Sequence, residues 1–321
     1  MDTILSKKYI FQAEENQHNP PLTDPVFIFN EIQYLSLWPE KIISCYLRNR
    51  HSGSITGFCH FQCENKTAWS LYQAPFASVY LKEDIGFGII GSFVSSMIDF
   101  LGERGISKIC LKHYPDFYSV SPPDKLITAL LFAGFQIKQT DINHALIISE
   151  QPFEVSVHAM QRRRILKCAS RGYLFQHHEN NELEFLFKKI QELRMQKNIP
   201  VKITLERLKV LVDRFPDQYH LFSVQDNGRI IAITLMVSVN STTLYNFLPA
   251  SDEKYSTSSP MVYLIKNLYE YALSHHYRYI DLGVSSIKNQ PQSGLINFKE
   301  NLGGVPGIKF LLEKTIESKN V

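Results

Sequence analysis

One order of elements occurs twice in this sequence of 321 residues, and the repetition constrains the fold more than any single motif. Each half reads as three strands, a helix, a strand, a shorter helix and a last strand. In the first half these are residues 43–50, 55–63, 67–72, 89–103, 106–111, 122–133 and 145–148. In the second half they are residues 219–225, 229–239, 242–248, 259–274, 277–282, a helical turn around 298–299, and 307–312. The strands that begin at residues 43 and 219 lie 176 positions apart, and those at 106 and 277 lie 171 apart. This spacing predicts a duplicated α/β architecture with mixed sheets of the α+β type.

Length and composition agree with two folded domains. A chain of this length exceeds the usual size of one domain, so we expect domains at residues 1–152 and 153–321. We expect the last strand, residues 307–314, to pack on the first domain. The first 38 residues read as irregular apart from a short helix at 27–37. The apolar fraction of 44% suffices for two cores, and the net charge of +3 is too small for nucleic-acid binding across the whole surface.

The cysteines and histidines predict neither a disulfide framework nor a metal site. Five cysteines are an odd number, and they are scattered: Cys45, Cys59, Cys63, Cys110 and Cys168. The two histidine pairs, at 177–178 and 275–276, consist of adjacent residues whose side chains splay apart. No secretory signal opens the chain, and no run approaches the roughly 20 apolar residues of a membrane helix. We therefore expect a cytoplasmic protein with reduced thiols and no membrane span.

Residues 279–304 hold the strongest candidates for chemistry. Asp281 ends a buried strand, where side chains emerge at the edge of the sheet. Its carboxylate can accept a proton or position a substrate amine, or it can cap the following turn. Ser285 is either a turn residue or a partner in a substrate hydrogen bond. Lys299 is either an ordinary exposed lysine or a cation that stabilises developing negative charge. The residues alone leave these alternatives open.

Three further positions are candidates for binding. Ser259 precedes Pro260 and predicts a helix start, with Ser259 as the cap, whose free amides can bind an anion. Residues 250–260 contain no glycine, so a glycine-rich cradle for the pyrophosphate of coenzyme A is not expected there. Arg163 and Arg164 lie on a basic helix that either meets a phosphate backbone or is simply solvated. Tyr245 lies on a strand beside the expected site and either binds substrate or belongs to the core.

The order of elements resembles the GNAT acyltransferase fold, and two copies in tandem resemble the Fem family of bacterial transferases (FemABX-like). Members of that family add amino acids to peptidoglycan precursors. Three stretches carry the resemblance: the basic helix at residues 161–169, the helix and strand at 259–283, and residues 294–304. The last of these is similar to the closing pattern G-L-x-x-F-K-x-x-x-G-G of the family. The resemblance covers residues 153–312.

The resemblance implies a function and two roles. Lys299 would stabilise negative charge during transfer, and Phe298 would pack against the acyl-acceptor channel. The expected reaction is N-acyl transfer of an acyl or aminoacyl group onto a small-molecule or peptide amine, as in cell-wall precursor modification. The donor would be an aminoacyl-tRNA, an acyl-CoA or an acyl carrier protein, with no permanently bound cofactor. Two alternatives stay open: a CoA- or carrier-protein-dependent transferase on a small amine, and a binding module that kept the fold without catalysis.

Overall fold

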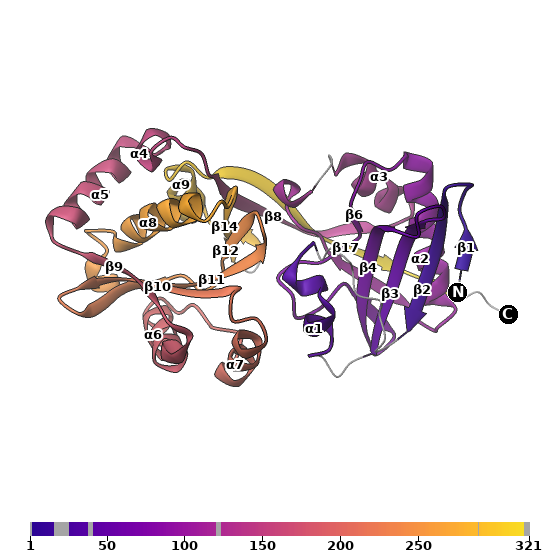
Figure 1. Ribbon diagram of the computed structural model, residues 1–321, viewed down its shortest axis with the longest axis horizontal. Helices are drawn as coiled ribbons and strands as arrows, with labels where there is room; N and C mark the ends of the chain where they lie inside the picture. The colour runs from indigo at the N-terminus through magenta and orange to yellow at the C-terminus, as the bar shows by residue number, and fades with distance from the viewer. Residues whose placement is uncertain (1, 16–25, 38–40, 120–122, 288, 318–321) are drawn as a thin grey trace. The chain divides into compact units, whose positions relative to one another are not determined.

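The computed structural model describes residues 2–15, 26–37, 41–119, 123–287 and 289–317 (Figure 1). The chain forms two compact units. Unit 1 consists of Met1–Ile142 and Gly307–Val321, and unit 2 of Asn143–Pro306. Both are α/β units, as predicted. We propose that the two sequence repeats, as distinct from these compact units, meet between residues 152 and 153.

Unit 1 is built on a sheet that takes its last strands from distant parts of the chain. Its strands follow the order β1 (Asp2–Ile4), β2 (Tyr9–Glu15), β3 (Lys41–Asn49), β4 (Ile55–Glu64), β5 (Thr67–Trp69), β7 (Lys108–Lys112), β17 (Val305–Thr315) and β8 (Gln136–Ile147), with β6 (Tyr80–Leu81) on β4. Strand β5 is parallel to β7, whereas β17 is antiparallel to β7. Helices α2 (Phe87–Gly102) and α3 (Asp124–Phe132) contribute to the apolar core on one face of this sheet. On the chain between β2 and β3 lie η1 (Ile28–Asn30) and α1 (Ile32–Leu35).

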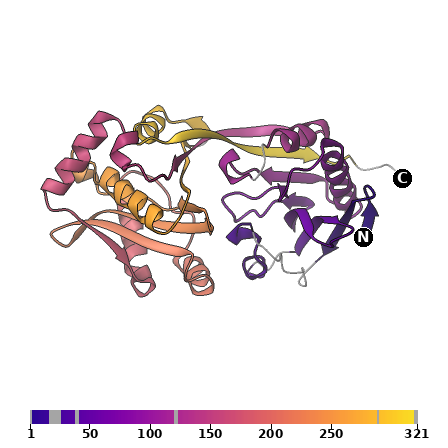
Figure 2. The same ribbon diagram turned by 45° about the horizontal axis from the view of Figure 1, so that its top comes forward.

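One prediction for the first half of the chain was wrong, and another was too short. The stretch before residue 38 was predicted to be irregular, but Tyr9–Glu15 within it form β2, which pairs with β3. Tyr9, Phe11 and Ala13 alternate inward, but this run is too short to stand out in the sequence. The strand predicted at residues 145–148 is the end of the twelve-residue strand β8. Its first half is polar and becomes a strand because β17 lies beside it (Figure 2).

Unit 2 repeats the strand pattern of unit 1. Its sheet follows the order β8, β14 (Tyr279–Val284), β12 (Thr243–Asn246), β11 (Arg229–Asn240), β10 (Tyr219–Asp226) and β9 (Leu174–His178), with β13 (Ala250–Ser251) on β11. Strands β12 and β14 are parallel, as β5 and β7 are in unit 1, and the other pairings here are antiparallel. This shared parallel pair supports the predicted duplication.

Helices cover both faces of the unit 2 sheet. Figure 1 shows α5 (Ala159–Ser170) and α8 (Pro260–Ser274) on one face, and α6 (Leu183–Met195) and α7 (Leu205–Arg214) on the other. Thr204 caps α7, because its side chain accepts a hydrogen bond from the amide of Arg207. Shorter elements complete the unit: α4 (Phe153–Ser156), η3 (Asn180–Glu182), η4 (Glu253–Tyr255), the pair β15 (Ser286–Ile287) and β16 (Gln290–Pro291), and α9 (Ser293–Glu300). Within the ranges given above, no helix combines the length and apolar character needed to span a membrane.

Candidate active site

The candidate site forms where the parallel strands β12 and β14 of unit 2 end. Tyr245 on β12 lies in register with Asp281 on β14. The pairing of β14 with β8 then shifts between Asp281 and Val284, which marks a β-bulge. Gly283 lies in this bulge with φ of 74°, in the left-handed region that favours glycine. Ligands of open α/β sheets bind beyond the carboxyl ends of the strands, so this bulge occupies the expected place.

Two buried charged side chains hold the bulge. A carboxylate oxygen of Asp281 accepts the amide hydrogen of Gly283 at 2.7 Å and a side-chain N–H of Asn143, also at 2.7 Å. The ammonium of Lys299 donates to the carbonyls of Gly283 and Val284, at 2.7 and 2.9 Å. Asp281 is 1% exposed and Lys299 6%. The bulge is therefore fixed at both its amide and its carbonyl groups.

Lys299 is a cation that has one N–H group beyond those used by the strand carbonyls. Burial lowers the pKa of Lys299 to about 8, and the neighbouring Asp281 charge opposes this shift. At neutral pH the side chain therefore keeps its proton. An ammonium has three N–H groups, and the described structure uses two of them on the strand carbonyls. The third can donate to an oxygen that gains negative charge.

The two glycines that close the sequence motif bring Lys299 to this position. Gly303 has φ of 80°, and a side-chain carbon there would lie 3.0 Å from the hydroxyl of Ser156. At Gly304 such a carbon would lie 2.7 Å from the carbonyl oxygen of Lys299 and 3.5 Å from the β-carbon of His144. Only glycine lets the chain pass this closely, so the pair seats the end of α9 against β8.

Two functional candidates escaped the sequence analysis: Asn143 and His144 on β8. Asn143 is the partner of Asp281 described above. His144 is fully buried, and its Nδ1 lies 2.9 Å from the hydroxyl of Ser285. Its Nε2 is buried without a hydrogen-bond partner in the described part of the chain. Burial, with a smaller effect of the Lys299 charge, lowers the pKa of His144 to about 4, so the ring is neutral at pH 7.

The chain also matches a known domain by sequence. Residues 158–291 match the acetyltransferase (GNAT) domain family. These residues form a GNAT domain. The match includes Tyr245, Asp281 and Ser285, whereas Lys299 lies beyond its end. The chain is thus an acyltransferase that contains a GNAT domain. A comparison with curated proteins found no match.

Solved structures show the same fold over most of the chain. FemX matches with a TM-score of 0.64 and 12% identity, over 85% of this chain and 87% of its own. A tandem GNAT protein from the clavulanic acid biosynthesis pathway matches with a TM-score of 0.55 and 11% identity, over 97% and 99%. The C-terminal domain of a putative lysylphosphatidylglycerol synthetase from Agrobacterium fabrum matches with a TM-score of 0.56 and 12% identity, over 83% of this chain and 82% of its own. At such low identities these matches establish the tandem GNAT fold and leave the substrate open.

Some of the predicted site residues meet at the bulge of the GNAT domain. Tyr245 is half-buried beside Asp281, and burial, with a smaller effect of Asp281, raises the pKa of its hydroxyl. The ring of Tyr245 lies near the bulge, since a side-chain carbon at Gly283 would be 3.6 Å from it. Ser285 is fully buried with His144. Phe298 is half-buried and packs against the core of unit 2.

The remaining predicted residues have other local roles. Ser259 precedes α8 as expected, but its side chain does not cap the helix. Its backbone is left-handed, with φ of 54°, and its hydroxyl donates to the carbonyl of Ser256, so the predicted cap was wrong. On α5, Arg163 is exposed and Arg164 donates to the side chain of Gln161 at 3.1 Å. Neither arginine contacts Asp281 or Lys299 within the described residues.

Proposed function

We propose that the chain transfers an acyl or aminoacyl group from an activated donor to an amine, and that the transfer takes place at the bulge around Gly283. The position of Lys299 carries this proposal. A buried ammonium, held by two strand carbonyls and left with one N–H, is a preorganised donor beside the expected ligand position. An exposed lysine on a helical turn would have none of these features.

The chemistry needs a stabilised oxyanion and a fixed geometry. When the amine attacks, a C–N bond forms and the carbonyl oxygen of the donor gains negative charge. The third N–H of Lys299 donates to that oxygen. Asp281 already accepts two hydrogen bonds, from Asn143 and Gly283. We therefore assign Asp281 to holding the bulge, with Tyr245 beside the reacting groups. As the bond to the leaving group breaks, the proton from the amine completes the released thiol or hydroxyl.

Two donor classes are consistent with this site. The description of the tandem GNAT structure says that it was solved without AcCoA, and so it names acetyl-CoA in connection with that protein. The lysylphosphatidylglycerol synthetase match names a lysyl group. An acyl-CoA or an aminoacyl-tRNA can therefore supply the group here. For the acceptor we propose an amine on a small molecule or a peptide, cell-wall precursors included.

A transfer assay tests the function directly. Radiolabelled acyl-CoAs and charged tRNAs are each incubated with the protein and a panel of amines that includes peptidoglycan precursors. We expect label in an amide product with one donor class. The Lys299→Ala variant should lose this activity, and Lys188→Ala, which removes an exposed lysine of α6, should keep it. Absence of product in every combination would contradict the proposal.

A further inference from the structure

A pocket in unit 2 lies away from the bulge. It has a volume of about 360 Å³ and is lined by residues of α6, of the 3-10 helix η3 and of strands β9, β10 and β11. This size suits a small molecule. Strand β11 lies only two positions from β14, but its pocket residues Arg229 and Ile230 are eight and seven residues along the strand from Val237, which pairs with Tyr245, or roughly 24–27 Å at the usual rise per residue. The pocket therefore belongs to a different site.

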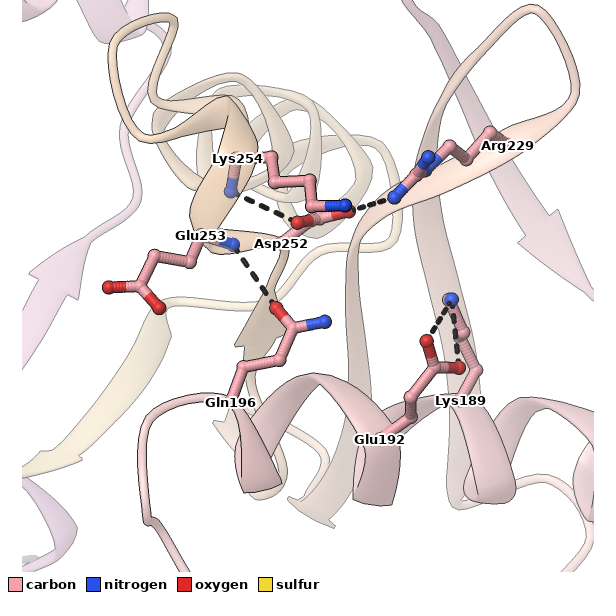
Figure 3. A network of polar contacts seen from close by, with 7 residues as sticks. All are labelled: Lys189, Glu192, Gln196, Arg229, Asp252, Glu253 and Lys254. Carbon is pink, nitrogen blue, oxygen red and sulfur yellow. Dashed lines mark hydrogen bonds and ion pairs between the residues drawn. The ribbon is translucent and has the colours of Figure 1, made fainter.

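Two cations line the pocket from opposite elements, Arg229 on β11 and Lys189 on α6. Figure 3 shows Arg229 on the strand side and Lys189 with Glu192 on the helix. Arg229 donates to Asp252 at 2.6 Å, and that carboxylate is fully buried. The guanidinium has five N–H groups, and the contact with Asp252 in the described structure involves only one of its terminal nitrogens. Arg229 is thus held in place while about half of its side chain stays exposed.

An acidic group lines the same pocket and is also held in place. Glu182 lies 3.1 Å from Nδ1 of His178 through one carboxylate oxygen. The other ring nitrogen of His178 lies 2.8 Å from the hydroxyl of Ser223. Both His178 and Ser223 are buried. A buried chain of polar groups therefore fixes Glu182 and leaves its second oxygen to accept a further hydrogen bond.

The charges that line the pocket balance. Lys189 and Arg229 are cations, and Glu182 and Glu192 are carboxylates. Lys189 is paired with Glu192 at 2.9 Å and Arg229 with Asp252 at 2.6 Å, so a ligand joins these pairs and does not meet isolated charges. A purely anionic ligand would meet both carboxylates, and a purely cationic one would meet both cations. A ligand that carries separate positive and negative groups matches both pairs. Phe185, which is 64% exposed, and Ile230 add apolar surface for a side chain.

We propose that this pocket, called the α6 pocket below, binds a small zwitterion of the amino-acid class, either a free amino acid or a dipeptide. The carboxylate of the ligand pairs with Arg229 and Lys189, and its ammonium with Glu182. The apolar part of the ligand packs on Phe185. The site is independent of the transfer reaction, because it shares no described residue with the bulge around Gly283.

Calorimetric titration of the whole chain tests this proposal with three probes. These are L-phenylalanine, the dipeptide alanyl-phenylalanine, and N-acetyl-phenylalanine amide, which has neither charge. Lys189→Gln and Glu182→Gln are the informative variants, since neither leaves a buried charge unpaired. Substitution of Arg229 is avoided because it would leave Asp252 buried without its partner. Lys188→Gln is the matched control, because this lysine lies on the same helix, is 65% exposed and does not line the pocket.

We expect saturable binding of at least one zwitterion, and the stronger of the two identifies the ligand as amino acid or dipeptide. Each informative variant should weaken this binding by about tenfold, the effect of losing one charged hydrogen bond. The blocked probe should bind more weakly than phenylalanine. Lys188→Gln and Lys299→Ala should bind as the unaltered protein does, whether or not transfer is ever detected. No binding of either zwitterion at millimolar concentration would overturn the proposal. An affinity that is unchanged in both Lys189→Gln and Glu182→Gln would overturn it as well.

Discussion

Asp281 and Lys299 bind the same residue from opposite sides, Asp281 at the amide of Gly283 and Lys299 at its carbonyl. The two residues are 18 positions apart in the sequence and lie on different elements, β14 and α9. Each satisfies a backbone group that the bulge would otherwise leave unpaired in a buried place. This arrangement explains why both charges are tolerated in the interior of unit 2. It is also the basis of the first two predictions.

Replacing Lys299 should slow transfer strongly without unfolding the protein. Lys299→Met keeps the length of the side chain and removes the N–H groups. We expect the transfer rate to fall about 10²–10³-fold, the usual effect of losing one donor to an oxyanion. The rate is measured with the donor and acceptor that the transfer assay identifies, and the fold by circular dichroism. Lys188→Met serves as the control. A folded Lys299→Met variant with the normal rate would contradict the catalytic role.

The pKa of Lys299 predicts opposite effects of pH on activity and on stability. Activity should decline as the pH rises through about 8, because the ammonium is lost there. The unfolded chain keeps its proton up to the ordinary value near 10.5, so between these two values the unfolded state binds more protons. The free energy of unfolding should therefore rise with pH in that window. Urea titrations of the unaltered protein and of Lys299→Met, taken at pH 8 and pH 10, measure the difference. If the free energy of unfolding changed equally between pH 8 and pH 10 in the two proteins, the result would count against the buried ammonium.

The buried ring of His144 predicts loss of stability in acid. Its pKa in the folded protein is about 4, against 6.5 for an ordinary histidine, so the unfolded state binds more protons between these values. Stability should fall as the pH drops from 6.5 to 4. His144→Asn keeps a polar atom near the position of Nδ1, which meets Ser285, and removes the titration. We expect this variant to lose less stability than the unaltered protein over the same window. A parallel loss in both would show that other groups dominate.

Gly304 should tolerate no side chain, although a neighbouring glycine on α9 should. In Gly304→Ala the new carbon would lie 2.7 Å from the carbonyl oxygen of Lys299, which is backbone and cannot turn away. We expect a loss of about 1–3 kcal/mol in the free energy of unfolding. Gly294→Ala is the control, because nothing lies within 4 Å of its new carbon. Alanine there should be neutral or stabilise the helix by up to about 1 kcal/mol. Equal effects on thermal unfolding would contradict the close packing of α9.

Local patterns in the sequence were enough to predict much of unit 2. Asn227 followed by Gly228 is a strong sequence signal for a hairpin, and both residues have positive φ, 48° and 80°. The helix predicted at residues 259–274 is confirmed as α8, and Thr204, a residue type that favours caps, caps α7. These features depend on side chains a few residues apart, which is why the sequence alone shows them. The motif around Lys299 was visible for the same reason, although its burial was not.

Contacts between distant residues were decided only by the tertiary structure. Asn143 meets Asp281 across 138 positions, and His144 meets Ser285 across 141. Nothing near either residue in the sequence indicates a partner, because the pairing of β8 with β14 brings them together. The full length of β8 likewise depends on β17, from the far end of the chain. The sequence alone determined the order of elements and the lysine motif. The long-range pairing of strands, which closes a backbone hydrogen-bond ladder, decided which buried polar groups surround that lysine.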